Sequence, residues 1–210
     1  MDTTAFPELW HSIPREIAAL LPNSFTLPYE AHLILNSIAR HSYQLYQHSL
    51  RVSHMAWHMS QTLGLPQYEH QQLWLAALLH DCGKTRLPRS VVVRPALGSP
   101  HWEFALYQQH VNEGIAILQA YPSLRSLIPL LAEHHERLDG TGFPHGSKYP
   151  TRSAQIIALA NVLDHLRAQP NSLGNNMQGV IDQAIGQDWD STVAATALNA
   201  WRQANLAEAG

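Results

Sequence analysis

The chain has 210 residues, 45% of them hydrophobic, so it is long enough to bury one full core. Its formal net charge of −3 excludes the strongly basic surface that drives binding to long nucleic acids. The single cysteine, Cys82, cannot form an internal disulfide, the start of the chain lacks the features of a signal peptide, and the longest apolar run, residues 73–79, is too short to span a bilayer. We therefore expect a cytoplasmic protein with no membrane partner.

Apolar residues recur at three- and four-residue intervals along most of the chain, which is the spacing of amphipathic helices. The segments with this pattern are residues 13–21, 31–39, 45–65, 68–83, 100–121, 123–140 and 153–169. Gly64, Gly83 and Gly140 follow the periodic residues, as glycines at helix ends do. Only residues 90–95 have a strand-like composition, and their proline argues against a strand. Residues 168–179 are rich in turn formers and predict a loop before a last helix. The pattern predicts an all-α fold.

Histidine is unusually frequent, with fourteen residues against thirteen lysines and arginines. Many of these histidines have no partner at a useful spacing, and we interpret them as surface or capping residues. His54 and His58 are four residues apart on one predicted helix face, but without a third ligand nearby a solvated face is the simpler interpretation. The other histidines interpreted in this way are His11, His32, His41, His70, His101, His145 and His165.

Six further polar residues lie in or at the ends of predicted helices that are rich in alanine and leucine. They are His48, His80, Asp81, His110, His134 and His135. Burying an unpaired imidazole costs about 1 to 3 kcal/mol, and an unpaired carboxylate costs more, so these side chains need partners from other helices. A metal centre would provide a partner for all of them.

The sequence "HDCGK" at residues 80–84 shows how such a centre could be built. Adjacent helical residues point about 100° apart, so His80 and Asp81 do not chelate one ion as residues four apart do. The two side chains can instead bind two neighbouring metals, or one can bind a metal while the other supports a ligand of that metal. Asp81 has two oxygens and could bridge two cations, while Lys84 would place an ammonium group nearby without competing for metal.

Five motifs occur in an order and spacing that resemble the HD-GYP branch of the HD phosphohydrolase superfamily. They are "HSLRV" at 48–52, "HDCGKTRLP" at 80–88, "QHVNEGIAIL" at 109–118, "HHERLDGTGFP" at 134–144 and "RSAQIIALANVLDHL" at 152–166. The resemblance runs from about residue 44 to 202 and includes residues 186–201, which are similar to the terminal helix of the family. It implies an all-α HD-domain helical bundle over residues 44–205, preceded by an N-terminal helical extension over residues 1–43.

The resemblance also implies a chemistry: hydrolysis of a cyclic dinucleotide, such as cyclic di-GMP, at two divalent metal ions, usually iron or manganese. Lys84 matches the lysine that contacts the scissile phosphate, and with Asp81 it is assigned to catalysis. Gly142, Phe143 and Pro144 stand where the family has Gly-Tyr-Pro, so we assign them to substrate binding. The ligand positions of the family fall on His48, His80, Asp81, His110, His134, His135 and Asn161.

Three departures from the family bear on activity. Asn161 replaces an aspartate ligand, and Gln44 stands where members with three metals have a glutamate. Asp164 matches the second aspartate of the family. It could restore a charge to the metal set if the helix turns slightly, but we expect it to support a ligating histidine or to lie in solvent. The basic stretch that grips the nucleotide is missing, and only Arg167 remains there. Because amides carry no formal charge, we expect at most two metals, with the second bound more weakly.

Three functions are consistent with this sequence. The first is a working phosphodiesterase, in which metals bind the phosphate oxygens and Lys84 stabilises the developing charge. The second is a degenerate domain that senses a ligand or binds a signalling protein partner. A third, more distant, uses an iron pair for oxygen chemistry. Metal-dependent turnover of a cyclic dinucleotide would distinguish the first from the others.

Overall fold

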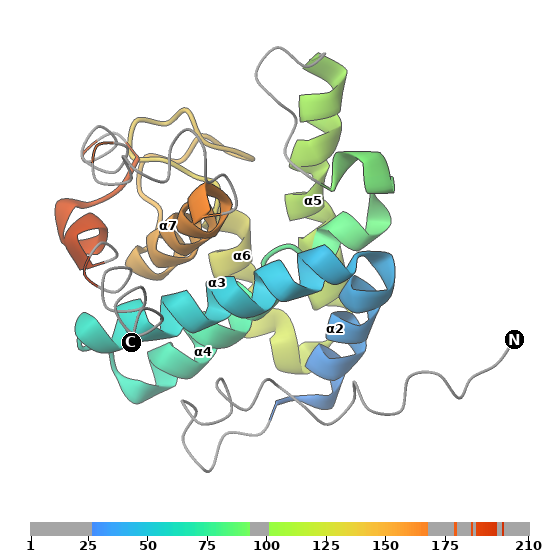
Figure 1. The fold of residues 1–210 in the computed structure, drawn as a ribbon, viewed down its shortest axis with the longest axis horizontal. Helices are drawn as coiled ribbons and strands as arrows, with labels where there is room; N and C mark the ends of the chain where they lie inside the picture. The colour runs from blue at the N-terminus through green and yellow to red at the C-terminus, as the bar shows by residue number, and fades with distance from the viewer. Residues whose placement is uncertain are drawn as a thin grey trace, which may run out of the picture.

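The computed structural model describes residues 27–92, 101–167, 179, 186, 188–196 and 199. Within these ranges the chain is helical and has no β-strand, which confirms the prediction of an all-α fold (Figure 1). The helix predicted at residues 13–21 and nearly all of the predicted loop at 168–179 lie outside the described residues. The α-helices are α2 (Tyr29–His41), α3 (Tyr43–Thr62), α4 (Gln67–Leu79), α5 (His101–Gln119), α6 (Ile128–Glu133) and α7 (Arg152–Arg167), and the 3₁₀ helices are η1 (Cys82–Arg86), η2 (Arg89–Val91) and η3 (Pro122–Leu127).

Helices α3 and α4 lie side by side in the middle of the bundle, and α7 packs across α3 (Figure 1). All residues of α4 from Leu73 to Leu79 are buried, so this helix is apolar on every side rather than along one stripe. Four apolar residues of α2, among them Ala31 and Ile38, belong to the same core. The boundary between an extension and the HD domain at residues 43 and 44 stays a prediction. No helix in the described part of the chain is long and apolar enough to cross a membrane.

A short junction at Ser42 directs α3 toward the functional site. Ser42 has an extended backbone with φ of −155°, which ends α2, and its Oγ accepts a hydrogen bond of 3.2 Å from the backbone N–H of Leu45. Serine in this position satisfies one of the free N–H groups at the start of a helix. The cap thereby fixes where α3 begins and sets the turn on which His48 lies.

The end of α4 differs from the sequence prediction. The helix predicted over residues 68–83 stops at Leu79, and the chain passes through His80 and Asp81 into η1. Gly83 does not end a helix with a positive φ, as Gly64 does with φ of +63°. Instead, a Cβ atom on Gly83 would lie 1.9 Å from the carbonyl oxygen of His110 and would overlap the backbone of α5. Gly83 is therefore required for close packing of two backbones.

The helix predicted over residues 123–140 is also shorter than expected. It consists of η3 followed by the single short helix α6, which ends at Glu133. His134 and His135 lie just past that end, and Gly140 follows in a turn with φ of +81°. Because the chain leaves the helix at this point, both histidines can turn toward the centre of the bundle.

We expect Gly83→Ala to destabilise the fold strongly, because the added methyl group would overlap backbone atoms of α5 that cannot move independently. Gly64→Ala is the matched control: a Cβ atom added there would have no other atom within 4 Å, so only the cost of the positive φ, about 1 kcal/mol, applies. Thermal unfolding followed by circular dichroism compares the two variants. Equal melting temperatures for both would show that the close approach at Gly83 is not required.

Candidate metal centre and adjoining cleft

The six predicted histidine and aspartate ligands converge from four places in the sequence. His48 comes from α3, His80 and Asp81 follow α4, His110 comes from α5, and the doublet at 134–135 follows α6. Their ligand atoms form two groups in which all atoms lie within 4.8 Å of one another. The first group is Asp81, His110, His134 and His135, and the second is His48, His80 and Asp81. Asp81 is shared by both groups.

The two oxygens of Asp81 face different histidines. Oδ2 lies 3.3 Å from Nε2 of His80 and 3.6 Å from Nε2 of His48, whereas Oδ1 lies 3.5 Å from Nε2 of His110. The side chain is fully buried, as are those of His80 and His110. This arrangement allows one carboxylate to contact two cations at once.

Backbone carbonyl groups fix the orientation of three imidazoles. Nδ1 of His80, His110 and His134 each lies 2.6 to 2.7 Å from the carbonyl oxygen of the residue three positions earlier. A carbonyl oxygen only accepts, so each Nδ1 carries the proton and donates. Each Nε2 therefore carries a lone pair, which is the form of histidine that binds a metal, and those of His80 and His110 lie near Asp81.

Buried atoms without a hydrogen-bond partner test whether these residues suit a metal. In the described part of the chain they include Nε2 of His48, Nε2 of His80, Oδ1 of Asp81 and Oδ1 of Asn161. Each unpaired buried atom costs about 1 to 3 kcal/mol. All four come from predicted ligands, and each is a lone-pair donor. The residues present therefore fit divalent cations.

The protonation states agree with metal binding. Burial lowers the pKa of His110 to about 4 and holds the pKa of His134 well below its usual value, with His80 and His110 adding to the effect on His134. Burial by itself would raise the pKa of Asp81, but His80 and Lys84 outweigh it and keep this pKa well below its usual range. At neutral pH His110 and His134 are thus neutral, and they lie beside a charged carboxylate.

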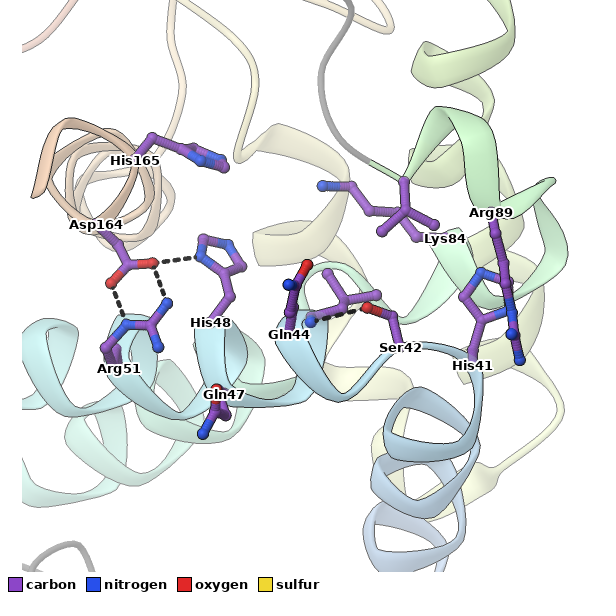
Figure 2. Close-up of a pocket in the computed structure, with 12 residues that line it drawn as sticks. His41, Ser42, Gln44, Gln47, His48, Arg51, Lys84, Arg89, Asp164 and His165 are labelled. Atoms are coloured by element: carbon purple, nitrogen blue, oxygen red, sulfur yellow. Dashed lines mark hydrogen bonds and ion pairs between the residues drawn. The ribbon is translucent and has the colours of Figure 1, made fainter. Parts of the chain in front are cut away.

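Asp164 supports His48 from the side opposite Asp81. Nδ1 of His48 donates to Oδ2 of Asp164 over 2.7 Å, and Arg51 donates to both oxygens of Asp164 (Figure 2). Burial would raise the pKa of Asp164, but the hydrogen bonds from His48 and Arg51 outweigh it and lower the pKa. Asp164 is buried and supports His48, so it has the first of the two expected roles and does not lie in solvent.

A cavity of about 740 Å³ adjoins the second group of ligands. This size falls within the roughly 300 to 1,000 Å³ of typical small-molecule sites. His48, Lys84 and His165 line it near the ligands, and His41 and Arg89 line its far end (Figure 2). The cavity is therefore a cleft in which a ligand would touch both the candidate metal centre and positively charged side chains.

Lys84 lies between the metal ligands and the cleft. Its Nζ donates to Oδ2 of Asp81 over 2.7 Å and lies 5.0 Å from the centre of the Tyr107 ring. Burial would lower the pKa of Lys84, but Asp81 and Tyr107 outweigh it and raise the pKa. A charged ammonium group is thereby held at the wall of the cleft.

The segment that contains Gly142, Phe143 and Pro144 packs against the ligand His135. The Phe143 ring stacks on the His135 ring with centroids 4.4 Å apart, and the Phe143 N–H donates to the His135 carbonyl oxygen over 3.1 Å. A Cβ atom on Gly142 would lie 2.5 Å from backbone atoms of Glu136 and His135. These contacts support the position of His135. The assignment of residues 142–144 to substrate binding stays a prediction.

Three residues of this site were not predicted from the sequence, and one of them was misjudged. Tyr107 and Arg51 had no assigned role, and His165 was interpreted as a surface residue. His165 is instead half-buried and stacks on His48 with ring centroids 4.9 Å apart. A signal was present, because His165 lies four residues after Asn161 and Tyr107 three residues before His110, spacings that share a helix face.

The two replaced ligand positions differ in their surroundings. Asn161 is buried on α7, with its side-chain oxygen unpaired, so an amide occupies the place that the resemblance gives to a carboxylate. Gln44 is exposed, and it lines the cleft one turn before His48 (Figure 2). Neither side chain adds negative charge to the second group of ligands.

In metal-free protein we expect stability to fall as the pH drops from about 6.5 to about 4. An unfolded histidine has a pKa near 6.5, and folded His110 has a pKa of about 4, so the unfolded state binds more protons between these values. His110 alone would remove on the order of 3 kcal/mol across this window. Urea unfolding in the presence of a chelator measures the change, and an unaltered midpoint between pH 7 and pH 4.5 would contradict it.

We expect Asp164→Ala to weaken metal retention about 10- to 100-fold, because His48 would lose the partner that fixes its protonated nitrogen. Metal content after dialysis against a graded series of chelator concentrations measures the effect. Arg86→Ala is the matched control, because it removes an exposed ion pair with Glu113 and touches no predicted ligand. If both variants retain metal like the parent protein, Asp164 does not support the centre.

Comparison with known proteins agrees with these motifs. A family model described as "HD domain" matches residues 32–186. The chain is 32% identical over 146 residues to the 3′3′-cGAMP-specific phosphodiesterase 1 of Vibrio cholerae, covering 67% of this chain and 33% of that protein. It is 30% identical over 142 residues to a cyclic di-GMP phosphodiesterase of Thermotoga maritima, covering 65% of this chain and 38% of that protein. The chain thus spans about a third of the length of these curated relatives.

Two solved structures share the fold. The HD domain of the phosphodiesterase PgpH from L. monocytogenes aligns with a TM-score of 0.63 at 16% identity, covering 85% of this chain and all of that one (100%). Bd1817 of Bdellovibrio bacteriovorus aligns with a TM-score of 0.62 at 21% identity, covering 82% of this chain and 61% of that one. The chain therefore belongs to the HD-domain family, in the HD-GYP branch that its motifs resemble.

Proposed function

We propose that this protein is a metal-dependent phosphodiesterase that hydrolyses a cyclic dinucleotide, such as cyclic di-GMP or a related molecule. The observation that carries the proposal is the position of Asp81, which is shared by two groups of potential ligands beside a cleft of about 740 Å³. The relatives from V. cholerae and T. maritima, which are named as phosphodiesterases of such molecules, support the substrate class.

The chemistry follows from the charges at the site. Two divalent ions, when bound, would supply electrophilic activation of the phosphodiester and a water nucleophile at neutral pH. His110, His134 and His135 would hold one ion, His48 and His80 would hold the other, and Asp81 would contact both. Lys84 would stabilise the charge that develops on the phosphate, since its ammonium group is already held at the wall of the cleft.

The number and type of metals form part of the proposal. An imidazole-rich set accepts several divalent metals, of which the family resemblance implies iron or manganese, and Asn161 would add an uncharged oxygen. Because Asp81 would be the only carboxylate on either ion, we infer at most two metals, and the ion held by His48, His80 and Asp81 would be lost more readily.

The replacement of both carboxylates also supports a second candidate function. With Asn161 and Gln44 uncharged, the domain could bind a cyclic dinucleotide or a signalling protein without turning the ligand over. The cleft and the ligand set would then serve recognition alone. The two functions differ in one measurable property: hydrolysis in the presence of bound metal.

The test uses protein purified without oxygen, loaded with iron or manganese, and assayed with cyclic di-GMP and with the mixed GMP–AMP dinucleotide. We expect Lys84→Met to keep its metal and lose about 100-fold or more in turnover, because the chain length is preserved while the charge is removed. Asp81→Ala should lose both metal and turnover.

Each alternative predicts a different result. Tight dinucleotide binding by loaded protein without hydrolysis would favour the binding module. Consumption of an organic substrate only when oxygen is present would favour the iron-pair chemistry. Full turnover by Asp81→Ala would reject the proposed metal mechanism.

A further inference from the structure

His165 has a position that neither the fold nor the metal ligands explain. It lies on α7 next to Asp164, and its ring stacks on His48 at an interplanar angle of 26°. It belongs to neither group of potential ligands, and no hydrogen bond links it to another described residue. No residue in the described part of the chain thus occupies its ring nitrogens, which could bind a ligand.

The ring faces the cleft. Figure 2 shows the side chains of His165 and Lys84 pointing toward one another, from α7 and from η1. Both residues line the cavity of about 740 Å³. The stack on His48 fixes the plane of the His165 ring, so its orientation toward this space does not depend on a bound ligand.

A phosphodiester in this cleft would need hydrogen-bond donors. Lys84 provides one, whereas Nε and Nη2 of Arg51 already donate to Asp164. An imidazole always carries at least one N–H donor, whichever protonation state it adopts. His165 thus offers a further donor on the wall that faces Lys84.

We propose that His165 donates a hydrogen bond to a non-bridging oxygen of the phosphodiester that is cleaved, on the side opposite Lys84. This inference rests on the proposed function. It gives the protein a substrate contact near the place where the family's basic stretch is missing, and it makes His165 a catalytic residue rather than a surface residue. A neutral donor to a charged acceptor is a strong hydrogen bond, so its loss should weaken both binding and turnover about 10- to 100-fold.

The central variant is His165→Phe, which keeps a flat ring for the stack on His48 and removes both nitrogens. His165→Gln restores an N–H donor without the ring. His101→Phe is the matched control, because His101 is exposed at the start of α5 and does not line the cleft. Three quantities are measured for each variant: metal content, the dissociation constant of a hydrolysis-resistant phosphorothioate analogue of cyclic di-GMP, and kcat/KM for cyclic di-GMP.

We expect His165→Phe to keep its metal, bind the analogue about 10- to 100-fold more weakly and lose kcat/KM by a similar factor. His165→Gln should recover part of both losses, and His101→Phe should match the parent protein. Loss of metal from His165→Phe would overturn the proposal, since His165 would then act on the metal centre. Unchanged binding and turnover in His165→Phe would also overturn it.

The proposed function and this inference fail in different ways. If loaded parent protein hydrolyses the dinucleotide and His165→Phe behaves identically, the inference fails while the function stands. If the parent binds the analogue but does not hydrolyse cyclic di-GMP, and His165→Phe weakens that binding, the contact by His165 stands while the proposed phosphodiesterase activity is rejected. If the parent protein neither binds nor hydrolyses, both are overturned.

Discussion

The carboxylate of Asp81 is fully buried, and a charge removed from water in this way needs partners for both of its oxygens. The chain brings residues from distant parts of the sequence to this point, and those in its described part supply a hydrogen bond to Oδ2 but none to Oδ1. Lys84 donates to Oδ2, His48 and His80 lie near the same oxygen, and His110 on α5 lies nearest to Oδ1. Much of the bundle can be understood as the framework that holds these groups around a single anion.

Rigidity at this point comes from the backbone more than from side chains. Three imidazoles are oriented by carbonyl groups within their own helical turns, so their direction is set as soon as the helix forms. His48 is different, because its orientation depends on Asp164, which lies 116 residues further along the chain. The ligands near His110 are thus preorganised by local structure, whereas the ligand on α3 depends on long-range packing against α7.

Much of this arrangement could be predicted from the sequence, because local periodicity and local motifs carried the information. The helices from α2 to α7 lie within or close to the predicted segments, although α4 and α6 are shorter than predicted, and the six histidine and aspartate residues singled out in the motifs converge in the structure. The end of α4 could not be predicted, because this helix is apolar on every side. It has no one-sided apolar stripe, so no change in the pattern marks the residue at which the helix ends. His165 and Tyr107 were missed because their contacts cross between helices, and a contact of this kind leaves only a weak trace in sequence spacing.

The close contact at Gly83 has a mechanical consequence. Side chains between two helices normally act as a compliant layer, which repacks when one helix shifts relative to the other. At Gly83 no such layer separates η1 from α5, because the backbone of Gly83 lies against that of His110 and Gly114. The segment that bears Asp81 and Lys84 and the helix that bears His110 must therefore move as one body, so thermal motion can tilt the centre as a whole but cannot easily change the spacing within it.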